Sequence, residues 1–427
     1  MAHYTIEGGR QLCGTIHPGG NKNAALPCLA ATLLSSETVT LRNIPRIRDV
    51  ETLLEIMSLL GAEIRWAEAN TVEINAAGVN SYRPDPELCG RIRASVLLAG
   101  PLLARFGEVV LPSPGGDVIG RRRLDTHVEG FKWLGATSEV ESNGIRLKGD
   151  LSATSPSVFL DEPSVTGTEN LVMACATLPG QVTLRNVASE PHVQDLCRLL
   201  VCMGASIRGI GSNTLIIEGS RELGGAEMRI AADHIEIGSF IGLASATRSD
   251  INIADVPMEH MHSTLLGFRR LGVSVEPVED SLIVEGSKTP KVQKELFGHI
   301  PKIDDGPWPA FPADLTSIAL VTATLSEGAI MIHEKMFESR MFFTDKLVGM
   351  GARIVLCDPH RALVMGPSHL RGATLESPDI RAGMSLLIAA LAAEGESVIH
   401  NVQQIERGYA DIDRRLNGLG ASIERHA

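Results

Sequence analysis

The chain has 427 residues, of which 44% are hydrophobic and 21% are charged, and its formal net charge is −12. This composition is typical of a globular protein with two or three domains, and the acidic balance argues against a protein that coats nucleic acid. The seven cysteines show no paired CxxC spacing, and no apolar run reaches the ~18 residues that cross a membrane. We therefore expect a reduced, cytoplasmic protein without disulfides, zinc or membrane insertion.

One short glycine signal recurs six times along the chain. In each copy a Leu or Met ends an apolar segment and a glycine follows, and most copies continue into an alternating segment that is typical of a strand. The six glycines are Gly61, Gly135, Gly204, Gly272, Gly351 and Gly420. Repetition at a spacing of roughly 70 residues indicates six copies of one unit that contains helix and strand.

A second element precedes these glycines: an apolar helix rich in small residues, a turn and an alternating strand. The clearest copies predict helices at 24–34, 171–178 and 384–393, and counterparts begin near Ala94, Gly238 and Leu315. One such unit is near the lower size limit for an independent core, and three packed together would bury the apolar helices from all sides. We therefore expect two pseudo-threefold α/β domains with a ligand site in the cleft between them, and a solenoid is the alternative.

Two segments in the first third of the chain suit an anionic substrate. The sequence Gly19-Gly20-Asn21-Lys22 precedes an apolar helix, and backbone amides with a cation at a helix start favour phosphate. The turn-rich loop 112–125 carries Asp117 and the run Arg121-Arg122-Arg123, which suits a mobile lid over an anion. A solvated lysine and an exposed charged loop are the structural alternatives.

The second half of the chain offers carboxylates and arginines. Asp314 and Asp379 each stand where a helix is expected to begin, so helix capping alone would explain them. Arg340 and Arg407 follow acidic residues and are ordinary surface residues unless a ligand meets them. The pair His260-Met261-His262 has no supporting acid or cysteine, so it predicts no metal site.

Taken together, these segments resemble the enolpyruvyl transferases along essentially the whole chain. The most specific pieces are residues 20–27, 114–117, 163–165, 311–314 and 407–409. The resemblance implies a two-domain, inside-out α/β barrel fold, in which six repeated βαβαββ-type units give each domain threefold pseudo-symmetry. It also implies that residues 1–20 pack with 231–427 as one discontinuous domain, that 21–230 form the second, and that the active site lies in the cleft between them.

The reaction implied by the resemblance transfers the enolpyruvyl group of phosphoenolpyruvate to the 3-hydroxyl of UDP-N-acetylglucosamine and releases phosphate. This is the first committed step of peptidoglycan precursor synthesis, and it connects the chain to cell wall biogenesis, cell shape and cell division. The chemistry needs an acid, a base and positive charge, but no cofactor and no metal. The expected partners are these two small molecules, without nucleic acid, and the oligomeric state is open.

The resemblance also assigns roles to residues. Lys22, Arg122, Arg381 and Arg407 should hold phosphoenolpyruvate, Asp314 should accept the hydroxyl proton, and Asp117 should donate a proton. Asp379, Arg340 and Met336 are expected as further members of the site. The residues expected at the nucleotide sugar are Asn23, Arg93, Arg122, Arg123, Leu124, Asp125, Thr126, Glu162, Pro163, Ser164 and Val165.

Several positions depart from the commonest family pattern. Asp117 stands where most members have cysteine, so fosfomycin, which alkylates that thiolate, should not inactivate this chain. Arg123 replaces a usual proline, Glu162 stands where Lys or an aromatic is common, and Thr166-Gly167 replaces Gly-Ala. These changes leave three alternatives open: transfer to another nucleotide, transfer to shikimate 3-phosphate, or a non-catalytic homologue that binds nucleotide sugars.

Overall fold

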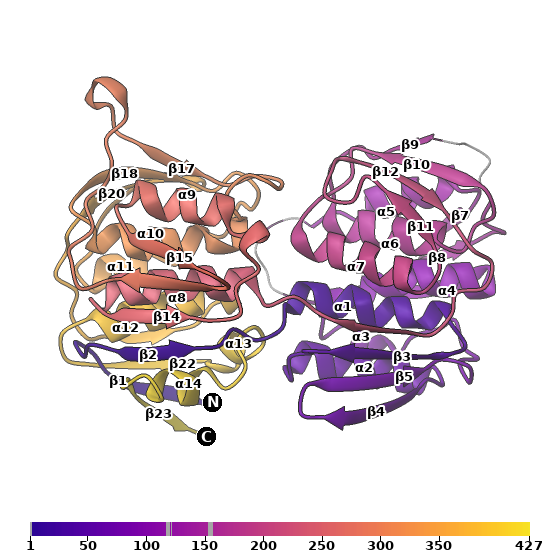
Figure 1. Ribbon diagram of the computed structural model, residues 1–427, viewed down its shortest axis with the longest axis horizontal. Coiled ribbons are helices and arrows are strands. Elements are labelled where there is room, and N and C mark those ends of the chain that lie inside the picture. The colour runs from indigo at the N-terminus through magenta and orange to yellow at the C-terminus, as the bar shows by residue number, and fades with distance from the viewer. Residues whose placement is uncertain (1, 117–119, 121, 153–156) are drawn as a thin grey trace. The chain divides into compact units, whose positions relative to one another are not determined.

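The computed structural model describes residues 2–116, 120, 122–152 and 157–427. The chain divides into two compact units, which we treat separately. Among the described residues, unit 1 holds 2–19, 120 and 232–427, and unit 2 holds 20–116, 122–152 and 157–231. Each unit contains three sheets, with helices enclosed among them (Figure 1). The two-unit, inside-out α/β fold expected from the sequence is confirmed, although each sheet is open in the described residues and none closes into a barrel.

The sheets repeat one strand pattern, in which a parallel pair stands at one edge and antiparallel pairs complete the sheet. In unit 1, β17 (Lys302–Asp304) runs parallel to β18 (Gly328–His333), and β20 (Arg361–Gly366) lies antiparallel between β18 and β19 (Arg353–Asp358). The other two sheets of unit 1 have the orders β15 (Ser274–Val278), β16 (Ser281–Glu285), β14 (Asp250–Ile253), β2 (Cys13–Ile16) and β21 (Thr374–Glu376), β22 (Glu396–His400), β1 (His3–Glu7), β23 (Ser422–His426).

The sheets of unit 2 follow the same pattern, except that the third has three strands in the described residues. Their orders are β13 (Ala226–Arg229), β3 (Thr38–Arg42), β5 (Thr71–Asn75), β4 (Glu63–Glu68); β11 (Ser206–Arg208), β12 (Thr214–Glu218), β10 (Gln181–Arg185), β9 (Ser157–Phe159); and β6 (Glu108–Pro112), β8 (Gly144–Lys148), β7 (Thr137–Glu141). Three sheets in each unit account for the six repeats.

The six repeat glycines all have left-handed backbone angles, with φ between 84° and 113°. Such angles are strained for residues with a Cβ atom, which explains why glycine recurs where each helix gives way to a strand. The strongest steric demand is at Gly272, where an added Cβ would lie 2.1 Å from the Lys291 carbonyl oxygen. The repeated glycine is therefore a helix-ending device, as the sequence predicted.

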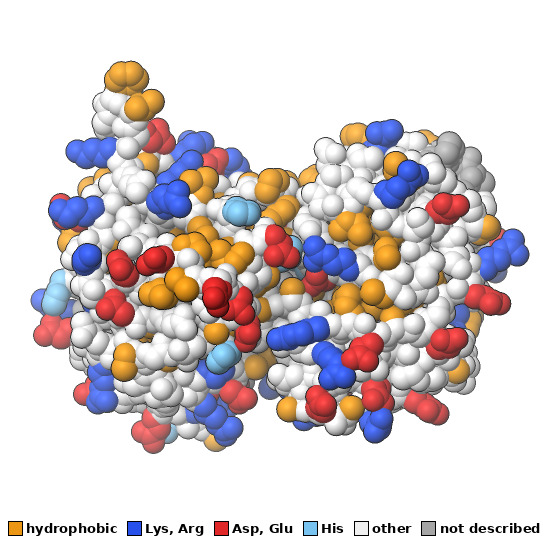
Figure 2. Space-filling view, viewed as in Figure 1, with side chains coloured by type: hydrophobic (Ala, Val, Ile, Leu, Met, Phe, Trp, Pro, Cys, Tyr) orange, Lys and Arg blue, Asp and Glu red, His pale blue; other side chains and the backbone are white. Residues whose placement is uncertain are grey.

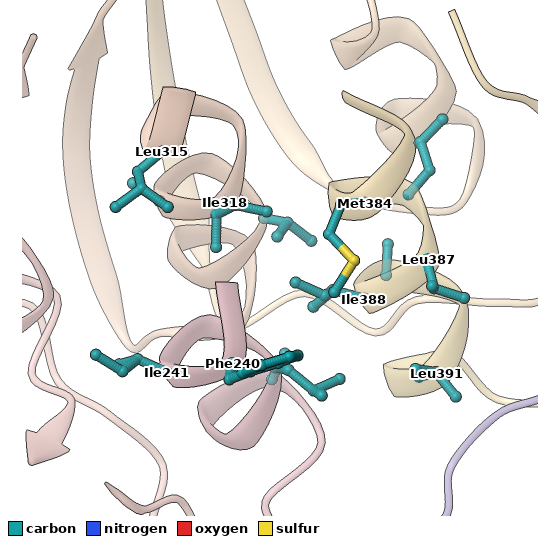
Figure 3. Packing of buried hydrophobic residues seen from close by; sticks show 14 of the residues in the cluster. Phe240, Ile241, Leu315, Ile318, Met384, Leu387, Ile388 and Leu391 are labelled. Atoms are coloured by element: carbon teal, nitrogen blue, oxygen red, sulfur yellow. The ribbon is translucent and has the colours of Figure 1, made fainter. Parts of the chain in front are cut away.

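Three almost completely buried helices form the core of unit 1: α8 (His234–Ala246), α10 (Thr316–Leu325) and α12 (Ile380–Ala392). In Figure 3, Phe240 of α8, Ile318 of α10 and Met384 of α12 lie among the side chains where the three helices pack. Helices that are apolar on all sides need to be enclosed, and the surrounding sheets of unit 1 enclose these.

The corresponding helices of unit 2 are α1 (Lys22–Ala31), α4 (Ala99–Phe106) and α6 (Val165–Cys175). Asn170 of α6 joins two of them, because its Oδ1 accepts from the Gly100 amide at 2.7 Å and its Nδ2 donates to the Val96 carbonyl at 3.0 Å.

The remaining helices are α2 (Arg48–Leu59), α3 (Pro86–Cys89), α5 (Asp125–Trp133), α7 (Pro191–Cys202), α9 (His262–Arg270), α11 (Thr344–Gly349), α13 (Gln403–Glu406) and α14 (Ile412–Asn417).

The surface and the thiols fit the composition. Acidic and basic side chains alternate over the visible face of each unit (Figure 2). All seven cysteines are free thiols, and four of them are buried. None of the described helices is both long enough and apolar enough to cross a membrane.

Candidate active site

Lys22 is a buried cation at the start of α1. The side chain of Asn21 caps this helix by accepting hydrogen bonds from the amides of Asn23 and Ala24 at 2.9 and 3.2 Å. Lys22 Nζ lies 2.7 Å from Asp49 Oδ2, and both side chains are less than a tenth exposed. The alternative of a solvated lysine is therefore wrong, and Asp49, at the start of α2, is a partner that the sequence did not reveal.

Arg93 lies in the 3-10 helix Arg93–Leu98 and organises the segment after the loop. Its Nη2 donates to the carbonyl oxygens of Arg122 and Arg123 at 3.0 and 3.4 Å. Burial, together with the neighbouring Arg122 charge, lowers the pKa of Arg93 to about 10. The half-buried guanidinium of Arg93 lies near that of Arg122, and an anion bound here would stabilise both positive charges.

His127, on α5, is a neutral buried neighbour of Arg93. Asn170 Nδ2 lies 3.0 Å from His127 Nδ1, and Thr166 Oγ1 lies 3.0 Å from Nε2. Because the amide nitrogen Nδ2 of Asn170 can only donate, Nδ1 of His127 accepts and its Nε2 carries the proton. Burial first, and then the charge of Arg93, lower the pKa of His127 to about 3. Nothing in the local sequence pattern marked this residue.

The stretch expected at the nucleotide sugar forms a connected polar cluster. Arg123 pairs with Asp125 at 3.2 Å and with Asp161 at 3.3 Å. Thr126 donates from Oγ1 to Asp161 at 2.6 Å and also lies 3.4 Å from Glu162 Oε1. The two carboxylates at 161 and 162 are therefore partly occupied by neighbours within unit 2.

The other expected members of this stretch have structural positions. Leu124 precedes α5, and Ser164 caps α6 by accepting from the Gly167 amide at 3.2 Å. Pro163 and Val165 flank that cap. The cap aligns the first turn of α6 beside the polar cluster.

In unit 1, Asp314 is held between two arginines that are distant in the sequence. Arg340 Nη2 lies 2.6 Å from Asp314 Oδ1, while Arg381 Nη2 and Nε lie 2.9 and 3.0 Å from Oδ2. The Asp314 side chain is 25% exposed and those of Arg340 and Arg381 are 10% and 8% exposed. The structural alternative of a helix cap is wrong, because Asp314 lies inside the 3-10 helix Ala313–Leu315, whose N-cap is Pro312.

The charges in this cluster support one another. Burial alone would raise the pKa of Asp314, but Arg381 and then Arg340 lower it far below its usual range. Burial likewise opposes the charge of Arg381, yet Asp314 raises the pKa of that guanidinium. Asp314 is thus an ionised carboxylate at neutral pH, and it is a weak base while both arginines hold it.

Two further residues extend the cluster. Arg381 Nη1 donates to the Tyr409 hydroxyl at 3.2 Å, and the same hydroxyl lies 2.8 Å from Ser239 Oγ. Asp379 caps α12, because its Oδ1 accepts from the amides of Arg381 and Ala382 at 2.8 and 2.9 Å. Asp379 therefore fixes the start of the helix that carries Arg381, and Tyr409 restrains the guanidinium from the opposite end.

The other expected residues of unit 1 are Arg407 and Met336. Arg407 donates to Gln404 Oε1 at 2.8 Å, and Met336 is 40% exposed. Asp117 lies outside the described residues. The structure thus joins Asp314, Arg340 and Arg381 in unit 1, whereas Lys22, Arg93, Arg122 and the stretch from Arg123 to Val165 all belong to unit 2.

No metal centre accompanies these groups in the described residues, since no three His, Cys, Asp or Glu side chains there are arranged to hold an ion. A surface cavity of about 530 Å³ in unit 2 is lined by Leu59, Arg83, Asp85 and Asn143, and none of the expected site residues contributes to its lining. The chemistry on offer is that of buried arginines, a lysine and carboxylates, which suits the binding of small anions and proton transfer.

Comparison with known proteins agrees with this chemistry. Residues 6–416 match the family model of EPSP synthase (3-phosphoshikimate 1-carboxyvinyltransferase). The chain is 58% identical over 426 residues to a UDP-N-acetylglucosamine 1-carboxyvinyltransferase of Bradyrhizobium diazoefficiens, covering 99% of this chain and 97% of that protein. It is 52% identical to the protein of the same name from Treponema denticola, covering 99% of each.

Solved structures share the fold. The enolpyruvyl transferase NikO from Streptomyces tendae superposes with a TM-score of 0.87 at 24% identity, covering 99% of this chain and 98% of that one. EPSP synthase from Acinetobacter baumannii gives 0.76 at 17% identity over the full length of both chains. The chain therefore belongs to the EPSP synthase family of carboxyvinyltransferases, the enolpyruvyl transferases.

Proposed function

We propose that this chain is a UDP-N-acetylglucosamine 1-carboxyvinyltransferase, which transfers the enolpyruvyl group of phosphoenolpyruvate to the sugar 3-hydroxyl and releases phosphate. The observation that carries the proposal is the Asp314–Arg340–Arg381 cluster, found in a chain that is 58% identical along its length to a protein of that name. The two arginines supply charge for anionic groups, and Asp314 is the base.

The reaction is an addition followed by an elimination. A proton from Asp117 adds to C3 of phosphoenolpyruvate, and the sugar hydroxyl attacks C2 while Asp314 takes the hydroxyl proton. The ionised Asp117 then takes a proton back from C3, the bond between C2 and the phosphate oxygen breaks, and the C2–C3 double bond re-forms as the enol ether of the sugar. The released phosphate takes the proton held by Asp314, so both carboxyl groups return to their starting states. Lys22, Arg122, Arg381 and Arg407 hold the phosphate and carboxylate, so no cofactor or metal enters the atom balance.

Binding of phosphoenolpyruvate makes Asp314 a better base in this proposal. Arg381 now directs two N–H groups to Asp314, and an incoming phosphate or carboxylate competes for them. Partial loss of that pairing raises the proton affinity of Asp314 as the acceptor hydroxyl arrives.

The nucleotide binds to unit 2 in this proposal. Arg123, Asn23 and the capped start of α6 offer donors to a diphosphate and an amino sugar. The free thiols favour a reducing compartment, so we place the activity in the cytoplasm. There the reaction begins the synthesis of cell wall precursors, on which cell shape and cell division depend.

The test measures phosphate release from phosphoenolpyruvate with UDP-N-acetylglucosamine, with mass spectrometry of the nucleotide. Parallel reactions use shikimate 3-phosphate and other UDP-sugars. A nucleotide that gains one enolpyruvyl group, with stoichiometric phosphate, supports the proposal. Turnover only with another acceptor would replace the assigned substrate, and absence of turnover with every acceptor would favour a non-catalytic binding protein.

A further inference from the structure

Two buried carboxyl groups lie next to each other behind the Asp314 cluster. Strands β17 and β18 run parallel with Asp304 opposite His333, so the next residues, Asp305 and Glu334, are neighbours where the strands end. The Asp305 amide donates to the His333 carbonyl at 3.3 Å, and the Lys335 amide donates to Asp305 Oδ1. Asp305 is 1% exposed and Glu334 is 0% exposed.

One oxygen of each carboxyl group makes no hydrogen bond in the described residues, and the Thr316 hydroxyl that faces Glu334 is likewise unpaired. Glu334 Oε1 accepts from the Phe337 amide at 3.2 Å, whereas Glu334 Oε2 and Asp305 Oδ2 are inaccessible to solvent and have no hydrogen-bond partner. Two ionised carboxylates offer only acceptors, so neighbouring oxygens of this kind need a proton between them. Burial, followed by the contact with Asp305, raises the pKa of Glu334 well above its usual range, against the opposing charge of Arg340.

The groups around Glu334 come from four segments. Asp305 faces it from the end of β17, Thr316 from the start of α10, and Arg340 from the segment that follows β18. The ring Nδ1 of His360 lies 2.8 Å from the Glu334 carbonyl oxygen, and the Glu334 amide donates to the His360 carbonyl at 2.8 Å. Arg340 is the cation in this set, and its other end binds Asp314.

We propose that Asp305 and Glu334 share one proton and, as a hydrogen-bonded acid pair, position Arg340 against Asp314. The Glu334 hydroxyl donates to Asp305 Oδ2, which satisfies both unpaired oxygens. Because Glu334 is then neutral, Asp314 is the stronger attraction for the Arg340 guanidinium. Loss of the shared proton would add a negative charge beside Arg340. That charge would compete with Asp314 for Arg340 and so disturb the cluster that includes Arg381, which the proposed function assigns to phosphoenolpyruvate.

The proton itself is tested by unfolding, without reference to activity. A carboxyl group whose pKa is raised on folding binds more protons in the folded state, so stability falls as the pH rises from the unfolded pKa towards the folded one. We expect the unfolding equilibrium constant of the wild type to increase with pH relative to that of Glu334→Gln, by up to about tenfold per pH unit. Glu327→Gln, at the exposed residue just before the same strand, is the control and should parallel the wild type.

Infrared difference spectroscopy gives a second measurement that does not depend on denaturation. The wild type should show the carbonyl stretch of a protonated carboxyl group at neutral pH, and this band should be absent from Glu334→Gln. A band unchanged by that substitution, or parallel pH dependence of the three proteins, would overturn the shared proton. Both results are readable even if the chain has no transferase activity.

The positioning role rests on the proposed function and is tested by kinetics. Glu334→Gln keeps a donor towards Asp305, so KM for phosphoenolpyruvate should stay within about threefold of the wild-type value at neutral pH. At alkaline pH the wild-type KM should rise by about tenfold while that of Glu334→Gln stays flat. Glu334→Ala, which lacks the donor, should have a raised KM at every pH. Equal pH profiles for the wild type and the glutamine variant would refute the positioning role, while absence of turnover in the wild type would refute the proposed function instead.

Discussion

Arg381 holds Asp314 with two donors on one oxygen, since Nη2 and Nε lie 2.9 and 3.0 Å from Oδ2. Arg340 occupies the other oxygen at 2.6 Å. A carboxylate held in this way is a weak base, and the same arginines are the groups best suited to an incoming phosphate. The proposed function therefore couples substrate binding and base activation through one guanidinium.

Asp314→Asn should separate catalysis from folding. The amide cannot take the hydroxyl proton, so kcat should fall by about 10²–10⁴-fold. It also leaves two buried guanidiniums short of negative charge, so the free energy of unfolding should fall by about 3–5 kcal/mol. Steady-state kinetics and urea unfolding measure the two effects. Asp358→Asn, which removes a surface partner of Arg361, is the matched control, and an active Asp314→Asn enzyme would exclude Asp314 as the base.

The buried pair of Lys22 and Asp49 should matter more to stability than exposed pairs do. Removing one partner of a buried pair leaves a charge in a poorly solvated place, so Asp49→Asn should reduce the free energy of unfolding by about 3–5 kcal/mol. Glu87→Gln, which removes the exposed partner of Arg91, should change it by less than about 1 kcal/mol. Equal effects in urea unfolding would contradict the buried environment of Lys22.

Lys22→Gln tests the role of the cation in catalysis. The substitution removes the charge proposed to hold phosphoenolpyruvate, so kcat/KM for that substrate should fall by about 100-fold or more. Initial rates at varied phosphoenolpyruvate and fixed acceptor measure the effect. An unchanged kcat/KM would confine Lys22 to a structural role with Asp49.

Acid should destabilise unit 2 through His127. Its pKa is lowered to about 3 by burial and by Arg93. Between pH 6.5 and about 3, His127 is therefore protonated in the unfolded chain but not in the folded chain. Stability should therefore fall between pH 6.5 and about 3, by up to about 1.4 kcal/mol per pH unit from this residue. His127→Gln should flatten part of this slope in denaturant unfolding measured across that range. His262→Gln, at an exposed histidine, is the control and should leave the slope as it is.

Fosfomycin should leave the wild-type enzyme active, because residue 117 is an aspartate and offers no thiolate to alkylate. Asp117→Cys should gain time-dependent inactivation together with one covalent adduct. Intact-mass spectrometry after incubation distinguishes the two proteins. An adduct located at Asp117 of the wild type would show that the carboxylate itself is alkylated.

Arg123 should affect the nucleotide and leave the donor substrate unaffected. Its guanidinium pairs with Asp125 and Asp161 in unit 2. A bound diphosphate can compete with these carboxylates for the guanidinium. Arg123→Ala should raise KM for UDP-N-acetylglucosamine by about tenfold and leave KM for phosphoenolpyruvate nearly constant. Arg208→Ala, at an exposed arginine of the same unit, should change neither constant.

The repeat architecture was predictable because its signal is local. Each glycine ends a helix in its own unit, and the positive φ that makes glycine necessary is set by adjacent residues. Helix starts were predicted less accurately: the helix expected at 24–34 begins at Lys22, because the Asn21 cap satisfies the first amides.

The site was predictable only through the resemblance. Arg340 and Arg381 are 26 and 67 positions from Asp314, and no periodicity brings such distant residues together. The partners that neither pattern nor resemblance identified, Asp49 and Glu334, are buried single residues whose roles depend on tertiary contacts. Local sequence contains no record of such contacts.

Strand β1 lies between β22 and β23, so its sheet can be completed only late in translation. Unit 2 leaves the ribosome whole before most of unit 1 has been made. Strand β1, although synthesised first, cannot gain both partners until Ser422–His426 has emerged. A nascent chain that stalls before that point keeps an open strand edge at its oldest end, and such edges invite pairing with other chains.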